Sequence, residues 1–415
     1  MSSTVAQRPQ IVIVGGGIGG LATAAFLHRA GLACTVYEQA TELREIGAGL
    51  VVAPNAVRLL RRLGVLEGLL EQAVQLEVGW EFRRWQDGTV LSAEDLASAC
   101  QRLYGEQTYT AHRADLLAAL RSAVPAGALR LGKRCVRVSF VDGRPHVHFA
   151  DGEVVEPDAL IAADGVHSVV RAAIADPEPP AYSGLCAFRA LVPAEHAPEF
   201  ARRPAQTLWI GPDHHLVHYP VSDGRYVNLV AFAPAGDCSV ESWTATATVE
   251  EFLAEFDGWD PRLLDLIRAA GTPGRWALLD RAPLTRWGTG AVTLLGDAAH
   301  PMFPFFAQGA AQAIEDAATL AWCLDDGIED PARALRRYEA LRLPRTTRLQ
   351  AESRTRSLVN HLPDGAEQLA RDKSFSDADP LLTSSWIYGY DAKLAFDDNL
   401  GSDPAISRRP RSTRR

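Results

Sequence analysis

Three glycines directly after a short apolar strand constrain the fold of this chain more than any other feature of its sequence. Residues 10–14 read QIVIV, a β-branched run typical of a buried parallel strand, and Gly15, Gly17 and Gly20 follow at GxGxxG spacing. Glycines at these positions allow a tight turn, a close approach of the backbone to a ligand, and close packing of helix and strand. The helix that begins here presents free N–H groups and a positive dipole end, so the segment predicts a site for the pyrophosphate of a dinucleotide.

A second apolar strand and an acidic residue complete the unit. Residues 21–30 are rich in alanine and leucine and predict a helix, and residues 34–37 predict a strand that ends at Glu38. This βαβ arrangement indicates a doubly wound α/β domain. At this distance after the glycines, a carboxylate can accept hydrogen bonds from an adenosine ribose. Because Glu38 would repel a 2′-phosphate, we expect FAD or NAD rather than NADP at this site.

The composition limits the classes of function. Of 415 residues, 47% are hydrophobic and 22% are charged, which excludes a disordered, collagenous or coiled-coil chain. The net charge of -9 argues against nucleic acid as a partner, because the protein repels a phosphate backbone. The six cysteines are scattered, without the spacing of a zinc site or a disulfide framework, and no signal peptide or membrane helix is evident. We expect a cytoplasmic protein that binds no metal.

Two later segments distinguish a flavin from a nicotinamide nucleotide. Residues 158–171 read DALIAADGVHSVVR and residues 293–301 read TLLGDAAHP, and each places an aspartate and a glycine at the end of an apolar strand. Such a turn presents a carboxylate that can hold sugar-like hydroxyls. The ribityl chain of a flavin is a polyol of this kind, and NAD has none, so the two segments favour FAD.

Together the three segments resemble those of the single-component FAD-dependent aromatic hydroxylases, the family of salicylate and hydroxybenzoate hydroxylases. The resemblance covers nearly the whole chain, from Ile11 to about Tyr390. It depends on GxGxxG, on the DGxxSxxR stretch at residues 164–171, and on GDAAHP at residues 296–301. Three motifs in the right order are strong support, whereas any one of them is weak.

The domain organisation follows from a change of pattern between about residues 177 and 276, where alternating apolar stretches predict an antiparallel sheet. The expected fold class is α/β, with a doubly wound Rossmann-like FAD-binding domain and an inserted, mainly antiparallel β-sheet domain for the substrate. Residues 329–361 predict a long, arginine-rich helix with a mostly solvated face. The basic end of the chain predicts a disordered tail, with a patch for nucleic acid or a membrane as the alternative. The boundaries assign residues 1–75, 100–178 and 276–360 to the FAD-binding domain, 76–99 and 179–275 to the substrate-binding sheet domain, 361–396 to a C-terminal helical segment and 397–415 to the tail.

The resemblance implies contacts between individual residues and FAD. Arg113 would contact the phosphate and ribityl region, although a surface position at a helix start is the alternative, and Asp297 would bind the ribityl hydroxyls. The backbone N–H groups of Gly309 and Ala310 would face the isoalloxazine edge, where the reduced flavin is negative. In this family the aspartate at position 164 is associated with both FAD and NAD(P)H. The residues expected to contact the cofactor are Gly15, Gly17, Ile18, Gly20, Glu38, Arg44, Arg113, Val136, Asp164, Asp297, Gly309 and Ala310.

The resemblance also implies the reaction. NADH or NADPH docks transiently and reduces FAD, and oxygen then gives a C4a-hydroperoxyflavin that hydroxylates an aromatic ring. The ring must be electron-rich, which ionisation of a ring hydroxyl achieves. A general base, or a group that is hydrogen-bonded to the phenolate, should therefore face the flavin from the inserted domain.

Residues 213–220, DHHLVHYP, supply the candidate catalytic residues. Alternation along a strand places His215 and Tyr219 on one face and His214 and His218 on the other. The spacing of His215 and Tyr219 is similar to that of a histidine and a tyrosine in the substrate pocket of the hydroxybenzoate and hydroxynicotinate hydroxylases. A neutral histidine can take a phenol proton at neutral pH. The alternatives are ordinary sheet residues with satisfied hydrogen bonds and, less favoured, a metal site.

The other residues expected at the substrate are Val51, Arg189, Pro301 and Phe305. Residues 301–306 read PMFPFF, and this apolar stretch predicts room for a larger or more apolar ring than a simple hydroxybenzoate. Arg189 could pair with a substrate carboxylate, although an arginine in a strand is more often structural.

We therefore expect a flavoprotein monooxygenase that uses NAD(P)H and O2 to hydroxylate a phenolic or hydroxybenzoate-like ring, as a monomer or homodimer. One alternative is an FAD-dependent oxidase, dehydrogenase or halogenase, or an epoxidase-type monooxygenase acting on a larger, apolar natural-product substrate. The others are an NAD-dependent dehydrogenase and a flavin-binding protein without catalytic activity.

Overall fold

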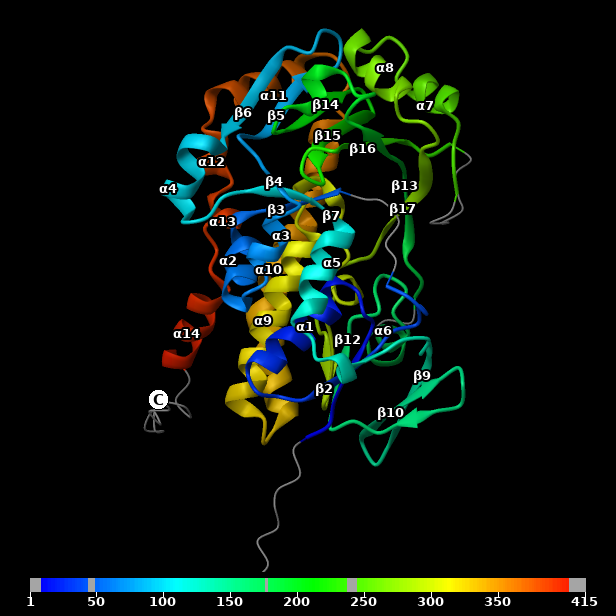
Figure 1. Cartoon of the computed structure of the whole chain (residues 1–415), viewed down its shortest axis with the longest axis vertical. Coiled ribbons are helices and arrows are strands. Elements are labelled where there is room, and N and C mark those ends of the chain that lie inside the picture. Colours follow the sequence, from blue (N-terminus) through cyan, green and yellow to red (C-terminus); the bar gives the residue numbers. More distant parts are fainter. Residues whose placement is uncertain (1–8, 44–48, 176–177, 237–244, 403–415) are drawn as a thin grey trace, which may run out of the picture.

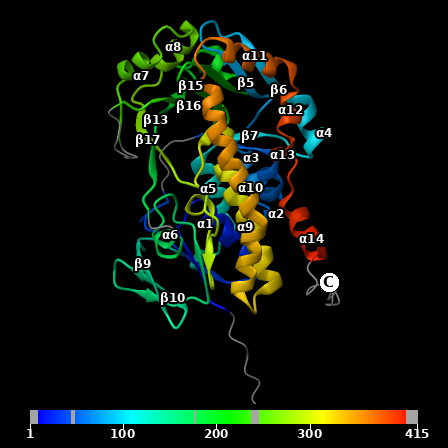
Figure 2. The same cartoon turned by 180° about the vertical axis from the view of Figure 1, so that it is seen from behind.

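Two sheets lie one above the other in this protein (Figure 1). The computed structural model describes residues 9–43, 49–175, 178–236 and 245–402. Helix α10, Pro331–Asn360, runs from the level of the lower sheet to the upper sheet, as Figure 2 shows from behind. The interface between the two sheets is where residues from distant parts of the chain meet.

The lower sheet is the dinucleotide-binding unit. Strand β1 pairs in parallel with β2 on one side and with β12 on the other, and helix α1, Ile18–Arg29, connects β1 to β2. All four residues of β1 are buried, in agreement with the apolar run in the sequence. The predicted doubly wound α/β fold is thus present. In sheet order the strands are β18 (Gly288–Thr289), β19 (Val292–Leu294), β12 (Ala159–Ala162), β1 (Ile11–Val14), β2 (Cys34–Tyr37) and β8 (Leu129–Arg130).

Helix α1 packs closely on α9, Gly309–Gly327, because a glycine lies between them. A Cβ atom at Gly19 would lie 2.7 Å from Cδ2 of Leu295 and 3.5 Å from Cβ of Ala313. Any larger residue would therefore push α1 away from the end of the sheet, where the glycine-rich turn lies.

The upper sheet combines two separate stretches of the chain. Strands β5 and β6, from residues 78–95, join strands from residues 181–280, and all neighbours are antiparallel except β14 and β5. The mainly antiparallel inserted sheet is as predicted. In sheet order the strands are β17 (Gly274–Asp280), β13 (Ala181–Pro193), β16 (Tyr226–Pro234), β15 (His214–Val221), β14 (Ala205–Gly211), β5 (Val78–Arg84) and β6 (Val90–Asp95).

The two faces of the upper sheet have different partners. One face carries Phe188 and Leu216, which pack in one cluster with residues of α7 (Val249–Glu255) and α8 (Pro261–Arg268). The opposite face carries Ala187 and Phe232, which pack against Phe305 of the loop that follows β19. This second face is turned toward the FAD-binding domain.

Shorter elements complete the fold. A three-stranded sheet consists of β3 (Gly49–Val52), β7 (Tyr109–His112) and β4 (Val74–Gln75), and another of β11 (Val154–Val155), β10 (Arg144–Phe149) and β9 (Cys135–Val141). The remaining helices are α2 (Pro54–Leu63), α3 (Leu66–Leu70), α4 (Gln101–Tyr104), α5 (Arg113–Ser122), α6 (Val169–Ile174), α11 (Ala366–Asp377), α12 (Pro380–Thr383), α13 (Ser385–Tyr388) and α14 (Ala392–Ser402).

The end of the chain requires a correction. Helix α14 continues to Ser402, so residues 397–402 are helical where we predicted the start of a disordered tail. The helix is held because Phe396 packs on Trp322 and beneath Arg337. Residues 403–415 lie outside the described residues.

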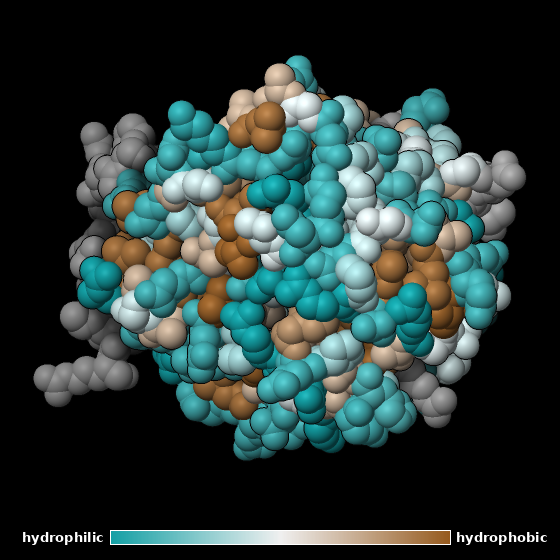
Figure 3. All heavy atoms as spheres, turned by 90° about the horizontal axis from the view of Figure 1, so that it is seen from above, coloured by the Kyte–Doolittle hydropathy of each residue, from teal (hydrophilic) through white to brown (hydrophobic). Residues whose placement is uncertain are grey.

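The surface of the molecule is mostly hydrophilic when seen from above, with apolar residues in scattered patches (Figure 3). Within the described part of the chain, no helix is both long enough and apolar enough to cross a bilayer.

Candidate active site

The glycine-rich turn leaves the first turn of α1 open. Gly15 has a φ of 104°, and a Cβ atom there would lie 2.2 Å from the carbonyl oxygen of Ala163. Gly17 is the N-cap of α1 without a side-chain cap, and no atom lies within 4 Å of the position of a Cβ atom. The N–H groups at Ile18 and Gly20 belong to this uncapped turn. Free N–H groups and the positive end of the helix dipole suit a pyrophosphate.

Glu38 lies directly beside this turn. Its Oε2 accepts a hydrogen bond of 2.6 Å from the N–H of Gly16, and its Oε1 accepts one of 2.8 Å from the N–H of Ala40. These two bonds fix the carboxylate at the end of β2, and each oxygen retains a lone pair for a ribose hydroxyl. Val136 lies on β9 in a separate small sheet with a 45% exposed side chain, and its contact with the cofactor stays a prediction.

The DGxxSxxR stretch connects two of the motifs. The Oδ2 atom of Asp164 accepts hydrogen bonds from the N–H groups of Val169 at 2.9 Å and Val170 at 3.4 Å. Burial raises the pKa of this carboxyl, and its Oδ1 has no hydrogen-bond partner among the described residues. The buried Arg171 donates to the carbonyl oxygens of residues 298 and 299, so it ties this stretch to the GDAAHP motif.

Asp297 is the one exposed residue between two buried neighbours, Gly296 and Ala298, in a short 3₁₀ turn. Gly296 has a φ of 60°, the left-handed conformation that favours glycine. Asp316 of α9 holds the turn in place, because its Oδ2 accepts from the N–H of Gly296 at 3.1 Å and lies 2.6 Å from Nε2 of His300. The turn thus presents a carboxylate that is not used for packing.

Two further helix starts border the same region. Gln308 precedes α9 without a side-chain cap, and no atom lies within 4 Å of a Cβ position at Gly309, so the N–H groups at Gly309 and Ala310 are open to a ligand. Arg113 is the first residue of α5 and is half-buried. Arg44, the remaining candidate, lies outside the described residues.

These features fit FAD. An uncapped helix N-terminus suits the pyrophosphate, an oriented glutamate suits the ribose, an exposed aspartate suits the ribityl hydroxyls, and a second uncapped helix suits an anionic ring edge. The orphaned Oδ1 of Asp164 is a further acceptor for a ligand hydroxyl or N–H group.

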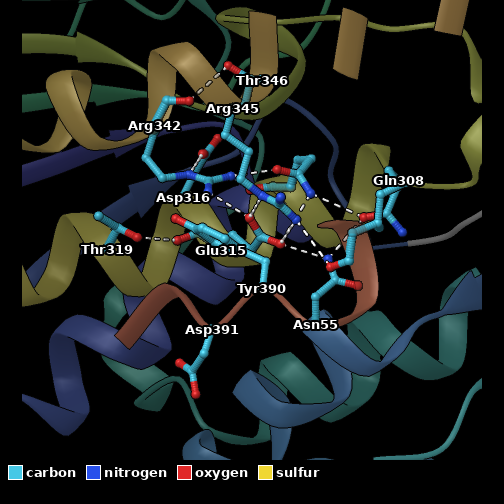
Figure 4. A network of polar contacts seen from close by, with 12 residues as sticks. Asn55, Gln308, Glu315, Asp316, Thr319, Arg342, Arg345, Thr346, Tyr390 and Asp391 are labelled. Atoms are coloured by element: carbon cyan, nitrogen blue, oxygen red, sulfur yellow. Dashed lines mark hydrogen bonds and ion pairs between the residues drawn. The ribbon is translucent and has the colours of Figure 1, made fainter. Parts of the chain in front are cut away.

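A buried charge network lies behind this region and was not predicted (Figure 4). Arg342 of α10, with a fully buried side chain, donates to Glu315 Oε2 at 2.6 Å, Asp316 Oδ1 at 2.7 Å and Gln312 Oε1 at 2.7 Å. Arg345 donates to both carboxylate oxygens of Glu315, at 2.8 and 3.0 Å. The prediction of a mostly solvated face for residues 329–361 is therefore wrong, because arginines of this helix neutralise buried acids of α9.

The network reaches the start of α9. The Nδ2 atom of Asn55, in α2, donates to Gln308 Oε1 at 2.9 Å and to Glu315 Oε1 at 2.7 Å. Because Gln308 directly precedes Gly309, the network positions the backbone that we expect at the isoalloxazine edge. The same acids hold the Asp297 turn through Asp316.

Above this region, β15 places His215 on the face turned toward the FAD-binding domain, as alternation predicts. The side chain is 2% exposed and is stacked on Phe232, with ring centroids 4.6 Å apart, while Phe305 meets it edge-on at 4.9 Å. Its Nδ1 lies 2.6 Å from Nε2 of His361, at the end of α10. Its Nε2 has no hydrogen-bond partner among the described residues. Burial, followed by the nearby His361 and His214, lowers the pKa of His215 well below its usual value.

Tyr219 and Val51 form a second buried cluster beside His215, because Val217 packs against both this cluster and that of Phe232 and Phe305. Both are buried and pack in one cluster, with Leu191 at its edge. Burial raises the pKa of Tyr219 far enough to keep the phenol protonated at neutral pH, although the charge of Arg189 opposes this. Gly49 allows the close approach, because a Cβ atom there would lie 2.8 Å from Cε2 of Tyr219.

Arg189 lies on the same sheet face with its guanidinium over the ring of Trp276, 4.7 Å from the centroid. Its buried Nε has no hydrogen-bond partner among the described residues. Burial lowers the pKa of Arg189 to about 10, so the group remains charged at neutral pH. Pro301 is buried at the start of the apolar loop, where its carbonyl oxygen accepts from Gln350 at 2.8 Å.

The other two histidines of β15 belong to the opposite face. His214 pairs with Glu255 at 3.2 Å, and Trp209 donates to Nε2 of His218 at 3.2 Å. Within the described residues, no three His, Cys, Asp or Glu side chains gather as a metal site would require.

Three comparisons with known proteins agree with this geometry. Residues 8–353 match the FAD binding domain family. A 3-amino-4-hydroxybenzoate 2-monooxygenase of Streptomyces platensis is 42% identical over 386 residues, which cover 93% of this chain and 97% of that protein. A 6-hydroxynicotinate 3-monooxygenase of Bordetella bronchiseptica is 37% identical over 362 residues, 86% of this chain and 94% of that protein. The solved substrate complex of a salicylate hydroxylase has a TM-score of 0.80 at 26% identity and covers 94% and 97% of the two chains.

Proposed function

Because the chain belongs to the FAD-dependent monooxygenases that hydroxylate aromatic rings, we propose that its substrate is a hydroxybenzoate, with an amino-hydroxybenzoate as the first candidate. The enzyme binds FAD and uses NAD(P)H and O2, as the sequence predicted. The substrate named for the relative that is 42% identical supports the amino-hydroxybenzoate. The observation that carries the proposal is a buried, neutral His215 with one ring nitrogen bonded and the other free, on the same sheet face as Tyr219 and Arg189.

When bound, FAD would supply the hydride acceptor for NAD(P)H and the oxygen activation that the reaction needs. The role of the protein at the cofactor site is to hold and orient FAD. In our proposal the α1 N-terminus and Glu38 bind the adenosine half, and Asp297 binds the ribityl hydroxyls. The open N–H groups of Gly309 and Ala310 stabilise negative charge at the ring edge through direct hydrogen bonds and the helix dipole.

On the substrate side, His215 accepts the proton of the ring hydroxyl. Its lowered pKa keeps the imidazole unprotonated at neutral pH, and its free Nε2 carries the lone pair that a base needs. Tyr219, which stays protonated because burial raises its pKa, donates a hydrogen bond to the resulting phenolate. Ionisation raises the electron density of the ring, which is the property that oxygen transfer requires.

Arg189 would pair with the substrate carboxylate. The guanidinium is charged, buried, and lacks a carboxylate partner among the described residues, so the protein itself does not offset its desolvation. A carboxylate ligand would do so through charge-assisted hydrogen bonds. Val51, Pro301 and Phe305 supply apolar walls for the ring.

The apolar loop Pro304–Phe306 favours a second candidate substrate, a larger apolar ring. We also propose the domain boundaries given above, with the C-terminal helical segment extended to Ser402, together with a cytoplasmic location and a monomer or homodimer. The joining of β5 and β6 to β13–β17 in one sheet supports the pairing of residues 76–99 with 179–275.

The test is NAD(P)H oxidation by the FAD-loaded enzyme with 3-amino-4-hydroxybenzoate, 3-hydroxybenzoate, salicylate and a carboxylate-free aminophenol, with oxygen uptake and peroxide recorded together. We expect stimulated oxidation with little peroxide for a carboxylated ring. His215→Ala should keep FAD and NAD(P)H oxidation but release peroxide instead of hydroxylated product. Stimulation by the carboxylate-free aminophenol alone, or wild-type coupling in His215→Ala, would contradict the proposal.

A further inference from the structure

The His215–His361 pair brings together two parts of the chain that are far apart in sequence. His215 comes from the middle of the upper sheet, and His361 is the C-cap of α10. The separation of 2.6 Å between Nδ1 of His215 and Nε2 of His361 is that of a short hydrogen bond, so one proton lies between the two rings. The backbone fixes His361 as well, because its N–H donates to Ser357 and its carbonyl oxygen accepts from Asp213.

The pair leads from the buried pocket toward the surface. His215 is 2% exposed and lies between the rings of Phe232 and Phe305, whereas His361 is half-buried. Among the described residues, His361 is the titratable group within hydrogen-bond distance of the His215 ring, so a proton taken up by His215 can pass directly to it. Among the residues that the structure describes, His361 is thus the hydrogen-bonded route by which a proton can leave this base.

The surroundings of the pair keep both rings neutral. Burial, and then the neighbouring His214, lower the pKa of His361 to about 4. His214 lies on the other face of β15, where it bonds to Glu255. The remaining neighbours of His215 are the rings of Phe232, from β16, and Phe305, from the loop after Pro301. No described carboxylate bonds to either ring, so an imidazolium in this pair would be unstable and a proton would not rest there.

We propose that His361 is a positioning and relay residue: it fixes the tautomer in which His215 can act as a base and conducts the proton of the substrate hydroxyl to solvent. This inference rests on the proposed function, because it requires a substrate that ionises at His215.

The transfer balances as follows. Both rings begin neutral, with the Nδ1–H of His215 donating to Nε2 of His361, which leaves Nε2 of His215 unprotonated. The O–H bond of the ring hydroxyl breaks and an N–H bond forms at Nε2 of His215, while the Nδ1 proton moves to Nε2 of His361. The Nδ1 proton of His361 passes to water. The ring is left as a phenolate, one proton reaches solvent, and both imidazoles are again neutral; the reverse sequence reprotonates the product.

The experiment measures ionisation rather than turnover. The FAD-loaded, oxidised enzyme is mixed with 3-amino-4-hydroxybenzoate or 3-hydroxybenzoate in weak buffer, and phenolate absorbance and proton release to an indicator dye are followed in a stopped-flow instrument. His361→Gln preserves a hydrogen bond to His215 but cannot carry a proton. We expect unchanged affinity for the probe, phenolate formation slowed by about 10-fold or more, and recovery of the rate with added imidazole.

His218→Gln is the matched control, because it removes a histidine of the same strand from the opposite face, one that acts on the pKa of neither ring, and it should leave the rate unchanged. Should His361→Gln fold poorly, His361→Asn and a proton inventory of the wild-type enzyme in H2O–D2O mixtures take its place. More than one proton in flight predicts a curved inventory, and a linear one contradicts the relay.

Three outcomes overturn the proposal. A wild-type rate of proton release in His361→Gln refutes the relay alone. A slowed rate with weakened binding and no recovery with imidazole assigns His361 a purely structural role. The absence of any phenolate in the wild-type enzyme refutes the proposed function and the relay together.

Discussion

Replacing Arg342 with methionine tests the buried charge network directly. The side chain is fully buried, makes three hydrogen bonds of 2.6–2.7 Å, and neutralises two buried acids, Glu315 and Asp316. Methionine fills much of the same volume but leaves Asp316 without a charge partner other than His300. Loss of one partner of a buried ion pair costs about 3–5 kcal/mol, because the remaining charge is buried and uncompensated. We expect Arg342→Met to lower the free energy of unfolding by that amount.

Arg348→Met is the matched control on the same helix. Its side chain is 57% exposed, and its guanidinium lies 3.9 Å from Glu352 and 4.0 Å from the centroid of the Trp386 ring, so the loss should be about 1 kcal/mol. The assay is urea unfolding at pH 7.5 with FAD in fixed excess, followed by circular dichroism and flavin fluorescence. Because the network also holds the turn of Asp297 and the start of α9, FAD affinity should fall in Arg342→Met and not in the control.

The pH dependence supplies an independent check. Burial by itself raises the pKa of Asp316, but the charges of His300 and Arg342 outweigh it and hold the pKa to about 2. Because the pKa of Asp316 is lower in the folded than in the unfolded wild-type protein, its ionised carboxylate stabilises the fold. This contribution is fully present above the unfolded-state pKa of about 3.9 and is lost only as the pH falls below that value. In Arg342→Met the buried acids protonate more easily, so the loss should be larger at pH 7.5 than at pH 5. A loss equal to that of Arg348→Met, or independent of pH, would refute the reasoning.

Three further predictions concern the ligands. Asp297→Ala should purify with little FAD, because the ribityl hydroxyls lose their acceptor; full flavin absorbance per chain would contradict its assigned role. Arg189→Leu should raise KM for a carboxylated ring by about 10-fold or more, as expected for the loss of a charge-assisted hydrogen bond, while KM for a carboxylate-free phenol stays unchanged; equal effects on both would exclude carboxylate pairing. Because the pKa of His215 is lowered, its neutral form persists below the usual histidine range, so kcat/KM should not fall between pH 8 and 6.5, and a histidine-like loss near pH 6.5 would show that the base is not shielded as the structure implies.

The local geometry of the candidate cofactor site could be predicted because each of its parts is local in sequence. The turn at Gly15, the acid at Glu38 and the turn before Asp297 each occupy a few consecutive residues, and strand–turn–helix geometry determines where their backbone N–H groups and carboxylates lie. Neighbouring motifs then meet because parallel strands end at one edge of a sheet. The predicted fold class follows from the same local patterns.

The charge network could not be predicted, because its partners come from two helices with opposite sequence signals. Arg342 lies among many arginines in a helix whose composition is typical of a solvated surface, and Glu315 and Asp316 lie in the alanine-rich first half of α9. Only the packing of α9 against α10 shows that these charges neutralise each other. The adjacent acids in a buried helix were the available signal, because such acids require partners.

His361 was missed for a different reason. It follows the last residue of a long helix, where a polar residue is an ordinary helix end, and 146 positions separate it from His215. Alternation along β15 identifies the face of His215 but not what approaches that face. The helix end comes within hydrogen-bond distance only because α10 runs from one sheet to the other.

In the proposed mechanism, the distribution of charge around His215 explains why a proton route is needed. Phe232, Phe305 and Val51 make the site apolar, so a phenolate formed there loses hydration that the protein must replace. In the proposed mechanism Arg189 and the hydroxyl of Tyr219 compensate a carboxylate and a phenolate, but an additional imidazolium would be a fourth buried charge. If the proton leaves, the site holds one cation, Arg189, and the two anionic groups of the substrate. If the proton stays, the site also holds the unstable imidazolium of His215. In this proposal the apolar side chains and the half-buried His361 are parts of one arrangement, in which ionisation of the ring is favourable only if its proton leaves.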